Sequence, residues 1–161
     1  LRANGRGVSD KYDNQRIGMN SRLDTIQAAV LLAKMDAFIG EEIAAANEVA
    51  RRYDEALAGS GLVLPRVPED YTSSWAQYTV QLPEDSDRDA LQGALKEKGV
   101  PTMVYYPKPM HEQKAFEGVH LCPDGCPVVK RLCDTVLSLP MGPYLIREDL
   151  EFSARTLMGL L

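Results

Sequence analysis

Residues 17–29 read Ile-Gly-Met-Asn-Ser-Arg-Leu-Asp-Thr-Ile-Gln-Ala-Ala, and the character of the chain changes within this stretch. Residues 1–22 are polar and rich in glycine, which predicts a loop with little regular structure of its own. From Leu23 onward, apolar residues recur at the spacing of a helix, and Asp24 is suited to cap or charge its first turn. The stretch therefore predicts a loop that leads into a helix.

The predicted helix is long and extends over residues 23–58. Its apolar series continues after Gly40, and most of the charged residues that follow this glycine lie off the apolar stripe. Gly40 is the position at which we expect a bend. Gly59-Ser60-Gly61 is expected to end the helix, because glycine readily adopts the backbone conformation of a helix C-terminus.

The rest of the chain predicts short strands that alternate with helices. We expect strands at 62–65, 75–82, 100–105 and 136–139, and helices at 85–99, 127–133 and 147–161. The last helix is expected to turn these residues mostly inward: Leu150, Phe152, Ala154, Leu157 and Leu161. The order of elements predicts an α/β fold, in which a small α/β layer carries a long helical arm.

Composition narrows the class of protein. The chain has 161 residues, of which 45% are hydrophobic and 25% charged, as in an ordinary globular domain. No apolar run approaches the ~18 to 20 residues of a membrane span, and the N-terminus lacks the apolar stretch of a signal peptide. The net charge of -5 argues against a nucleic-acid-binding domain, which usually carries a basic face. We therefore expect no nucleic-acid partner and no membrane partner.

The three cysteines predict free thiols in a reducing compartment, and hence a cytoplasmic protein. Cys122 and Cys126, near His120, could be compared with a metal cluster completed by Cys133 or His111. Their spacing is not one of the common zinc patterns. The favoured interpretation is a loop followed by a helix with partly buried thiols, and no metal site is expected.

Two clusters of polar residues are candidates for a functional site. Asn20 and Arg22 lie just before the predicted helix, where an amide, a guanidinium and backbone N–H groups suit a phosphate or carboxylate. From the residues alone we favour the simpler alternative, in which Asn20 caps a turn and Arg22 pairs with Asp24. The second cluster, residues 105–111, could cover a sugar or nucleotide, or form a rigid surface loop, and the residues favour neither.

A resemblance to a known family rests on these two clusters together. Residues 17–29 closely resemble the Gly-x-Asn-x-Arg-Met/Leu-Asp…Gln-Ala-Ala signature of the DegT/DnrJ/EryC1/StrS family of sugar aminotransferases. Residues 101–111, Pro-Thr-x-Val-Tyr-Tyr-Pro-x-Pro-x-His, resemble its other C-terminal motif. Supporting matches occur in the family's order at Trp75-x-x-Tyr78, Arg88-Asp89 and Leu137-Ser138-Leu139-Pro140-Met141. The resemblance covers nearly the whole chain.

The resemblance implies the type I fold of transferases that depend on pyridoxal 5'-phosphate. It implies that residues 1–22 end the large cofactor domain, that 23–58 form the long linking helix, and that 59–161 form the small C-terminal α/β domain. In the family, the lysine that carries the cofactor lies upstream of these motifs, so no catalytic residue is expected in this segment. The family's active sites form at the interface of a homodimer, with residues crossing between subunits.

The resemblance also implies roles for individual residues. Asn20 would reach the phosphate of the cofactor in the neighbouring subunit, and Arg22 would approach the anionic groups of a nucleotide sugar. Tyr105, Tyr106 and His111 would line the substrate side. The family often has His-Tyr where this chain has Tyr105-Tyr106. A tyrosine at 105 can donate a hydrogen bond but is not a cation at neutral pH.

The activity that the resemblance implies is amination of a nucleotide-linked keto sugar by an amino acid donor, usually glutamate. Residues 105–111 look most like the branch that acts on UDP-linked 3-keto sugars, including uronates. Two alternatives stay open. One is a sugar dehydratase of the same family, and the other is a non-catalytic fragment that dimerises or interacts through the helix at 23–58.

Overall fold

A computed structural model of the chain describes residues 23–113 and 125–161. The chain divides into two compact units, Leu1–Gly40 and Glu41–Leu161. The predicted loop at 1–22 lies outside the described residues, as do Asn20 and Arg22. The described residues form helices and one small sheet, which confirms the predicted α/β class.

The predicted long helix is present as three consecutive helical segments: α1 (Thr25–Ala37), the π-helical segment η1 (Phe38–Glu42) and α2 (Ile43–Ala56). Asp24 caps α1 as expected, because its carboxylate accepts a hydrogen bond of 2.8 Å from the backbone N–H of Gln27. The π-helical segment contains Gly40, the position at which the sequence predicted a bend. Beyond α2, Gly59 has a φ of +75°, a value that favours glycine.

The sheet of the second unit contains two strands, β1 (Tyr78–Gln81) and β2 (Val136–Leu139). They pair antiparallel, with Tyr78 opposite Leu139. The strands predicted at 62–65 and 100–105 are reduced to single bridges, Val63 with Gln81 and Met103 with Ser138. The prediction of two further full strands was therefore wrong. Prolines within both stretches lack the N–H that a continuous ladder needs.

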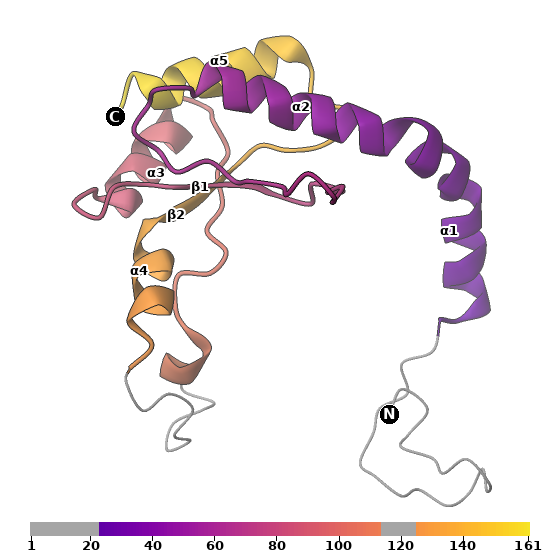
Figure 1. Cartoon of the computed structure of the whole chain (residues 1–161), viewed down its shortest axis with the longest axis horizontal. Coiled ribbons are helices and arrows are strands. Elements are labelled where there is room, and N and C mark those ends of the chain that lie inside the picture. Colours follow the sequence, from indigo (N-terminus) through magenta and orange to yellow (C-terminus); the bar gives the residue numbers. More distant parts are fainter. Residues whose placement is uncertain (1–22, 114–124) are drawn as a thin grey trace, which may run out of the picture. The chain divides into compact units, whose positions relative to one another are not determined.

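Within the described residues, the second unit also contains three α-helices, α3 (Arg88–Glu97), α4 (Pro127–Thr135) and α5 (Arg147–Met158), and the short 3-10 helix η2 (Met110–Glu112). Asp87 caps α3 and accepts a hydrogen bond of 2.9 Å from the N–H of Ala90. In Figure 1, α2 and α5 lie side by side, and these two helices are in contact. The sheet and its flanking helices enclose a core whose largest fully buried side chains include Tyr53, Tyr78, Leu57, Leu95, Leu137 and Leu157.

Some side chains depart from the predicted pattern of burial. In α5, Leu150, Ala154 and Leu157 are buried as expected. Phe152 and Leu161, which were expected inside, are instead 46% and 51% exposed. Leu161 follows the last residue of α5, and Phe152 lies on the face of α5 opposite the core, so neither side chain has a place in it.

The cysteines also correct the sequence-based expectation. Cys133 is a free and buried thiol, as expected for a helix with partly buried thiols. Cys126 is disulfide-bonded, so the prediction that all thiols are free was wrong. No group of metal-ligating side chains occurs within residues 23–113 and 125–161. In the same ranges, no helix combines the length and the apolar character that are needed to cross a membrane.

Candidate functional site

The segment from Pro101 to Gln113 carries the described members of the candidate site. Met103 anchors it to the sheet, because its N–H and C=O bond reciprocally to Ser138 at 3.0 and 2.8 Å. Gln92 adds a bond of 3.2 Å from its side-chain amide to the carbonyl oxygen of Thr102. Beyond Met103 the chain leaves the sheet; Val104 still packs against the core, and the side chains from Tyr105 onward line space outside it.

One pocket, which we call the loop–helix pocket, lies between this segment and α4. Its volume is about 430 Å3. The rings of Tyr105 and Tyr106 meet edge to face, with centroids 5.7 Å apart and an angle of 77° between planes. The loop wall consists of Tyr105, Tyr106, Pro107, Lys108, Pro109, Met110 and Gln113, and the helix wall consists of Val129, Leu132, Cys133 and Val136.

The loop–helix pocket is weakly polar. Lys108 is the one lining residue with a formal charge among those that the structure describes. Burial raises the pKa of the Cys133 thiol, and the neighbouring Asp134 and Glu112 carboxylates raise it further. The thiol is therefore neutral near pH 7, so it behaves as a small apolar group and not as a nucleophile.

A second, smaller pocket brings together three of the motifs that carry the family resemblance. Its volume is about 240 Å3. The lining residues come from the residues just before β1, from the segment around Met103, and from the end of β2 with the two residues after it: Ala76, Gln77, Pro101, Met103, Tyr105, Ser138, Leu139, Pro140 and Met141. Tyr105 lines both pockets and thus forms part of the partition between them.

Of the residues predicted for the site, Tyr105 and Tyr106 are brought together, and His111 is separate from them. His111 lies in the short 3-10 helix Met110–Glu112 and is not a lining residue of either pocket. Its Nε2 lies 3.9 Å from Oε1 of Glu112. The roles of Asn20 and Arg22 concern residues outside the described ranges.

The described lysines do not fit the role of a cofactor-bearing lysine, which needs a shielded pocket. All of them are exposed: Lys34, Lys96, Lys98, Lys108 and Lys130. Lys34, the one lysine that the sequence embeds in an apolar helical stretch, lies exposed on α1.

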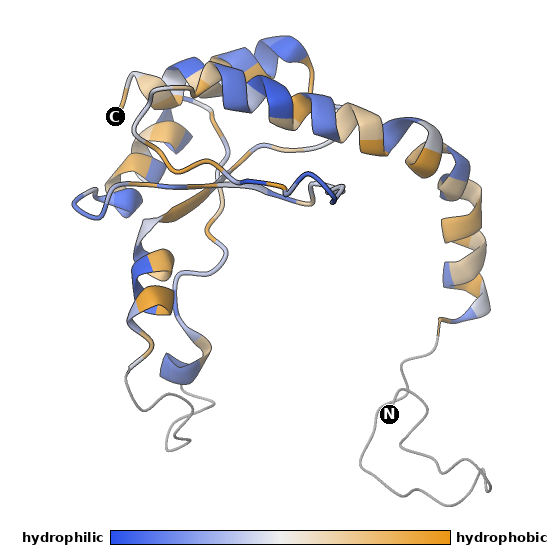
Figure 2. Cartoon of the chain, viewed as in Figure 1, coloured by the Kyte–Doolittle hydropathy of each residue, from blue (hydrophilic) through white to orange (hydrophobic). Residues whose placement is uncertain are grey.

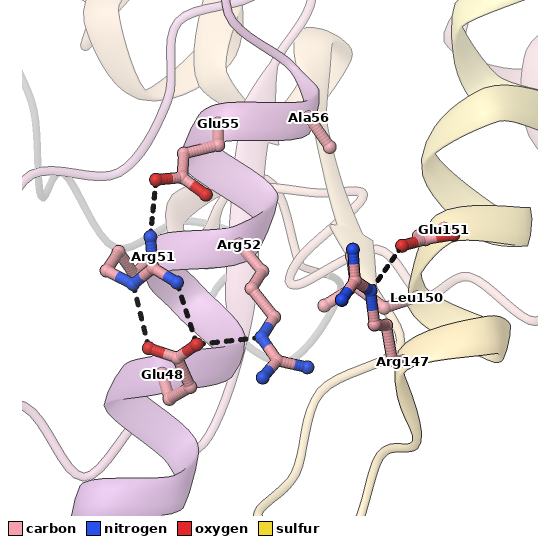
Figure 3. A pocket seen from close by; sticks show the side chains of 8 residues that line it. All are labelled: Glu48, Arg51, Arg52, Glu55, Ala56, Arg147, Leu150 and Glu151. Carbon is pink, nitrogen blue, oxygen red and sulfur yellow. Dashed lines mark hydrogen bonds and ion pairs between the residues drawn. The ribbon is translucent and has the colours of Figure 1, made fainter.

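A third pocket, of about 340 Å3, lies between α2 and α5 and is lined mainly by charged side chains. Figure 3 shows Arg51 paired with Glu48 and Glu55 on α2, and Arg147 paired with Glu151 on α5. Hydrogen bonds from Arg51 and Arg52 lower the pKa of Glu48 to about 2. Because its three arginines are matched by three glutamates, the pocket has no net charge with which to attract an ion.

Sequence reasoning missed two parts of the site. The first is the helix wall, where Val129 and Leu132 face the tyrosine-bearing loop across the pocket. The second is the structural role of Arg88, which the sequence marked only as part of a supporting motif. Arg88 is only 7% exposed, and its guanidinium donates to the carbonyl oxygens of Cys133 at 3.0 Å and Val136 at 3.2 Å. A signal for the helix wall existed, since Pro127 begins a short helix with apolar residues on one face.

Comparison with known proteins identifies relatives for most of the chain. A UDP-2-acetamido-2-deoxy-3-oxo-D-glucuronate aminotransferase of Pseudomonas aeruginosa is 43% identical over 141 residues, which cover 86% of this chain and 37% of the relative. A UDP-N-acetyl-3-dehydro-alpha-D-glucosamine 3-aminotransferase of Acidithiobacillus ferrooxidans is 40% identical over 161 residues, which cover 95% of this chain and 41% of the relative.

Solved structures agree with the relatives found by sequence. A DegT DnrJ EryC1 StrS aminotransferase from Brucella abortus superposes with a TM-score of 0.79 at 43% identity, and the match covers 97% of this chain and 40% of that chain. The chain thus spans about two fifths of the length of the proteins that it matches. The family model described as the DegT/DnrJ/EryC1/StrS aminotransferase family matches residues 1–156, and the chain belongs to this family.

Proposed function

We propose that the chain is the C-terminal part of an aminotransferase that depends on pyridoxal 5'-phosphate and aminates a nucleotide-linked keto sugar. The observation that carries the proposal is the similarity to two relatives, 43% and 40% identical, whose names are those of aminotransferases of UDP-linked 3-oxo sugars. The proposed amino donor is an amino acid such as glutamate. The proposed substrate is a UDP-linked 3-keto sugar, including the uronate class named for the first relative.

The cofactor is proposed to be held largely by residues that the structure does not describe. When bound, pyridoxal 5'-phosphate accepts the amino group and acts as the electron sink of the reaction, while the protein orients it. The exposed lysines described above do not suit its attachment. Asn20 is the residue proposed to contact its phosphate, in the neighbouring subunit of a homodimer.

The substrate is proposed to meet Arg22, Tyr105, Tyr106 and His111. Support for the tyrosines comes from their position in a pocket whose lining is apolar and aromatic, with few polar groups, as is common for small-molecule sites. Arg22 is proposed to pair with an anionic group, because a guanidinium suits both a carboxylate and a diphosphate.

The proposed domain arrangement assigns 1–22 to the end of a large domain, 23–58 to a linking helix and 59–161 to a small C-terminal domain. Supporting it, α1 is rich in apolar residues but has no buried one, which is expected of a helix whose partners lie elsewhere in a longer protein. A cytoplasmic location is proposed because nucleotide sugars and free amino acids are abundant in that compartment.

The proposal is tested with the complete protein, purified and supplied with pyridoxal 5'-phosphate. We expect a visible absorbance band that borohydride removes, and formation of a 3-amino sugar from a UDP-linked 3-keto sugar and glutamate, detected by mass spectrometry. Loss of water from the sugar without gain of nitrogen would identify a dehydratase instead. A protein that retains no cofactor and forms no product would refute the enzymatic assignment.

A matched pair of variants tests the role of Asn20. Asn20→Ala is expected to weaken cofactor retention, because it removes an amide proposed to bond to the phosphate. Asn14→Ala removes an amide from the same polar segment and is expected to leave retention unchanged. Equal retention in both variants would show that Asn20 does not hold the phosphate.

A further inference from the structure

We infer that the loop–helix pocket binds the pyrimidine base of the nucleotide, and that α4 supplies part of the surface that recognises it. The inference rests on the proposed function, since it assigns a part of the proposed substrate to this pocket. It adds Val129 and Leu132 to the site as specificity-determining residues, and Arg88 as a positioning residue.

The shape and chemistry of the pocket favour a flat and uncharged ligand. Two tyrosine rings and two prolines form one wall, and three aliphatic or thiol side chains of α4 form much of the other, with Val136 after the helix. A base can stack on an aromatic ring with either face, and such stacking contributes about 1 to 3 kcal/mol per base. The volume of about 430 Å3 is within the range of small-molecule sites.

The charges of the described lining residues favour a position for the diphosphate outside the pocket. Among the described lining residues only Lys108 carries a charge, and it is an exposed side chain. Burying two phosphates against Val129 and Leu132 would remove their hydration without supplying donors in return. The diphosphate is therefore expected outside the pocket, where Lys108 can approach it.

The number of hydrogen bonds that a ligand needs when it is buried favours the base over the sugar as the occupant of the pocket. A sugar presents several hydroxyl groups, and each needs a partner when it is buried. The described lining residues offer few polar side-chain groups, chiefly the tyrosine hydroxyls and the Gln113 amide, which donates a long bond of 3.4 Å to the Lys108 carbonyl oxygen. A pyrimidine needs only a few bonds along one edge, so the base matches the lining better than the sugar does.

The helix wall is held in place by a buried cation. Arg88 donates from one guanidinium nitrogen to the carbonyl oxygens of Cys133 and Val136, and both of these residues line the pocket. Its Nε also donates to Asp89 at 2.6 Å. Arg88 thereby ties the start of α3 to the end of α4 and fixes the position of the wall without contacting the pocket itself.

Two neighbouring valines offer a matched test in the complete protein. Val129 is 43% exposed and lines the pocket, whereas Val128 is 57% exposed and does not line it. Val129→Asp and Val128→Asp add the same charge to the first turn of the same helix, where a carboxylate is tolerated. We expect Val129→Asp to raise the Kd for UDP and dTDP at least about tenfold by calorimetry, because a carboxylate in the pocket must be desolvated. Val128→Asp should leave both values unchanged.

The controls distinguish the base from the rest of the substrate. N-acetylglucosamine 1-phosphate lacks the base, so its affinity should not differ between Val129→Asp and the parent protein. Arg88→Lys should raise the KM for the nucleotide sugar while the half-reaction with glutamate keeps its rate, because the wall is displaced and the cofactor is not. Unchanged UDP affinity in Val129→Asp, or an equal loss in Val128→Asp, would overturn the inference.

The failure of this inference and the failure of the proposed function give different results. If the complete protein aminates its sugar but Val129→Asp does not change its affinity for UDP, only the assignment of the base to this pocket is refuted. If the complete protein forms no amino sugar and Val129→Asp still weakens UDP binding, the proposed function is refuted and the base pocket is supported.

Discussion

Two consecutive helices of this chain, α1 and α2, differ sharply in what their apolar residues do. In α1 no residue is buried, although Ile26, Val30 and Leu32 are large and apolar. In α2 one face buries Ala46, Val49, Ala50 and Tyr53 against the core of the second unit. Figure 2 shows the contrast, with apolar residues common throughout α1 and mixed with strongly polar residues in α2.

The difference teaches that an apolar pattern predicts a helix but does not identify its partner. For α2 the partners are present, since the helix contacts α5 and its Tyr53 stacks on Tyr78 of β1. For α1 the apolar residues surround the helix, a pattern typical of a helix buried on several sides. The described residues do not bury it, and the relatives are more than twice as long as the chain, so we expect its partners in a longer protein or a second subunit.

The largest predicted difference between α1 and α2 comes from making the same Leu→Ala substitution at a buried and at an exposed position. Leu57, at the end of α2, is 1% exposed, whereas Leu32 in α1 is 72% exposed. In the 161-residue chain, Leu57→Ala should lower the free energy of unfolding by about 2 to 5 kcal/mol, because it leaves a cavity in the core. Leu32→Ala should change it by less than about 0.5 kcal/mol. Urea denaturation followed by Tyr and Trp fluorescence measures both, and equal effects would contradict the comparison.

The same Leu32→Ala substitution should behave differently in the complete protein. If the rest of that protein covers α1, the variant leaves a cavity there and should lower the free energy of unfolding by about 2 to 3 kcal/mol. Sedimentation of the parent and the variant shows whether a second subunit provides the cover, since loss of the dimer would accompany the loss of stability. An effect as small as in the 161-residue chain would mean that α1 remains uncovered.

A third prediction concerns pH and affects only the unit that contains α2. Burial raises the pKa of Tyr53 to about 12, and it also raises the pKa of Tyr78, where the bond to Asp54 adds to the effect. Because the pKa of Tyr53 is higher in the folded state, the neutral hydroxyl contributes its full stabilisation below pH 10, the ordinary pKa of tyrosine. It is lost as pH rises from 10 to 12, by about 2 kcal/mol.

The measurement is the unfolding midpoint in urea between pH 9 and pH 12. Tyr53→Phe removes the titrating hydroxyl, and with it the bond of 2.9 Å to the Pro140 carbonyl oxygen. This variant should be less stable than the parent near pH 8 but should lose less stability on alkaline titration. Tyr71→Phe, which alters a tyrosine that is exposed to solvent, is the control. Parallel pH curves for the parent and Tyr53→Phe would show that Tyr53 does not set the alkaline limit.

The parts of the fold that could be predicted from sequence are those with local causes. The caps at Asp24 and Asp87, the start of α4 at Pro127 and the end of β2 before Pro140 all follow from the backbone chemistry of single residues. The two lost strands depended instead on pairing, which prolines and neighbouring segments limit to one bridge each. The apolar face of the helix that begins at Pro127 could be predicted, but not its role as a pocket wall, because only the tertiary fold brings Val129 and Leu132 to Tyr105 and Tyr106.

The smallest predicted effect concerns the caps of α1 and α3, and it distinguishes the stability of a single helix from the stability of the whole fold. Asp24 and Asp87 cap α1 and α3 in the same way, each accepting a backbone bond, of 2.8 and 2.9 Å. Replacing either by alanine should destabilise its helix by about 1 kcal/mol. Because α3 buries Leu91 and Leu95 in the core, Asp87→Ala should lower the free energy of global unfolding by that amount. Because α1 buries nothing, Asp24→Ala should leave global unfolding unchanged and lower only the protection of its amides against hydrogen exchange. A global loss in Asp24→Ala equal to that in Asp87→Ala would mean that α1 is stabilised by contacts within this chain, and its apolar residues would then need no outside partner.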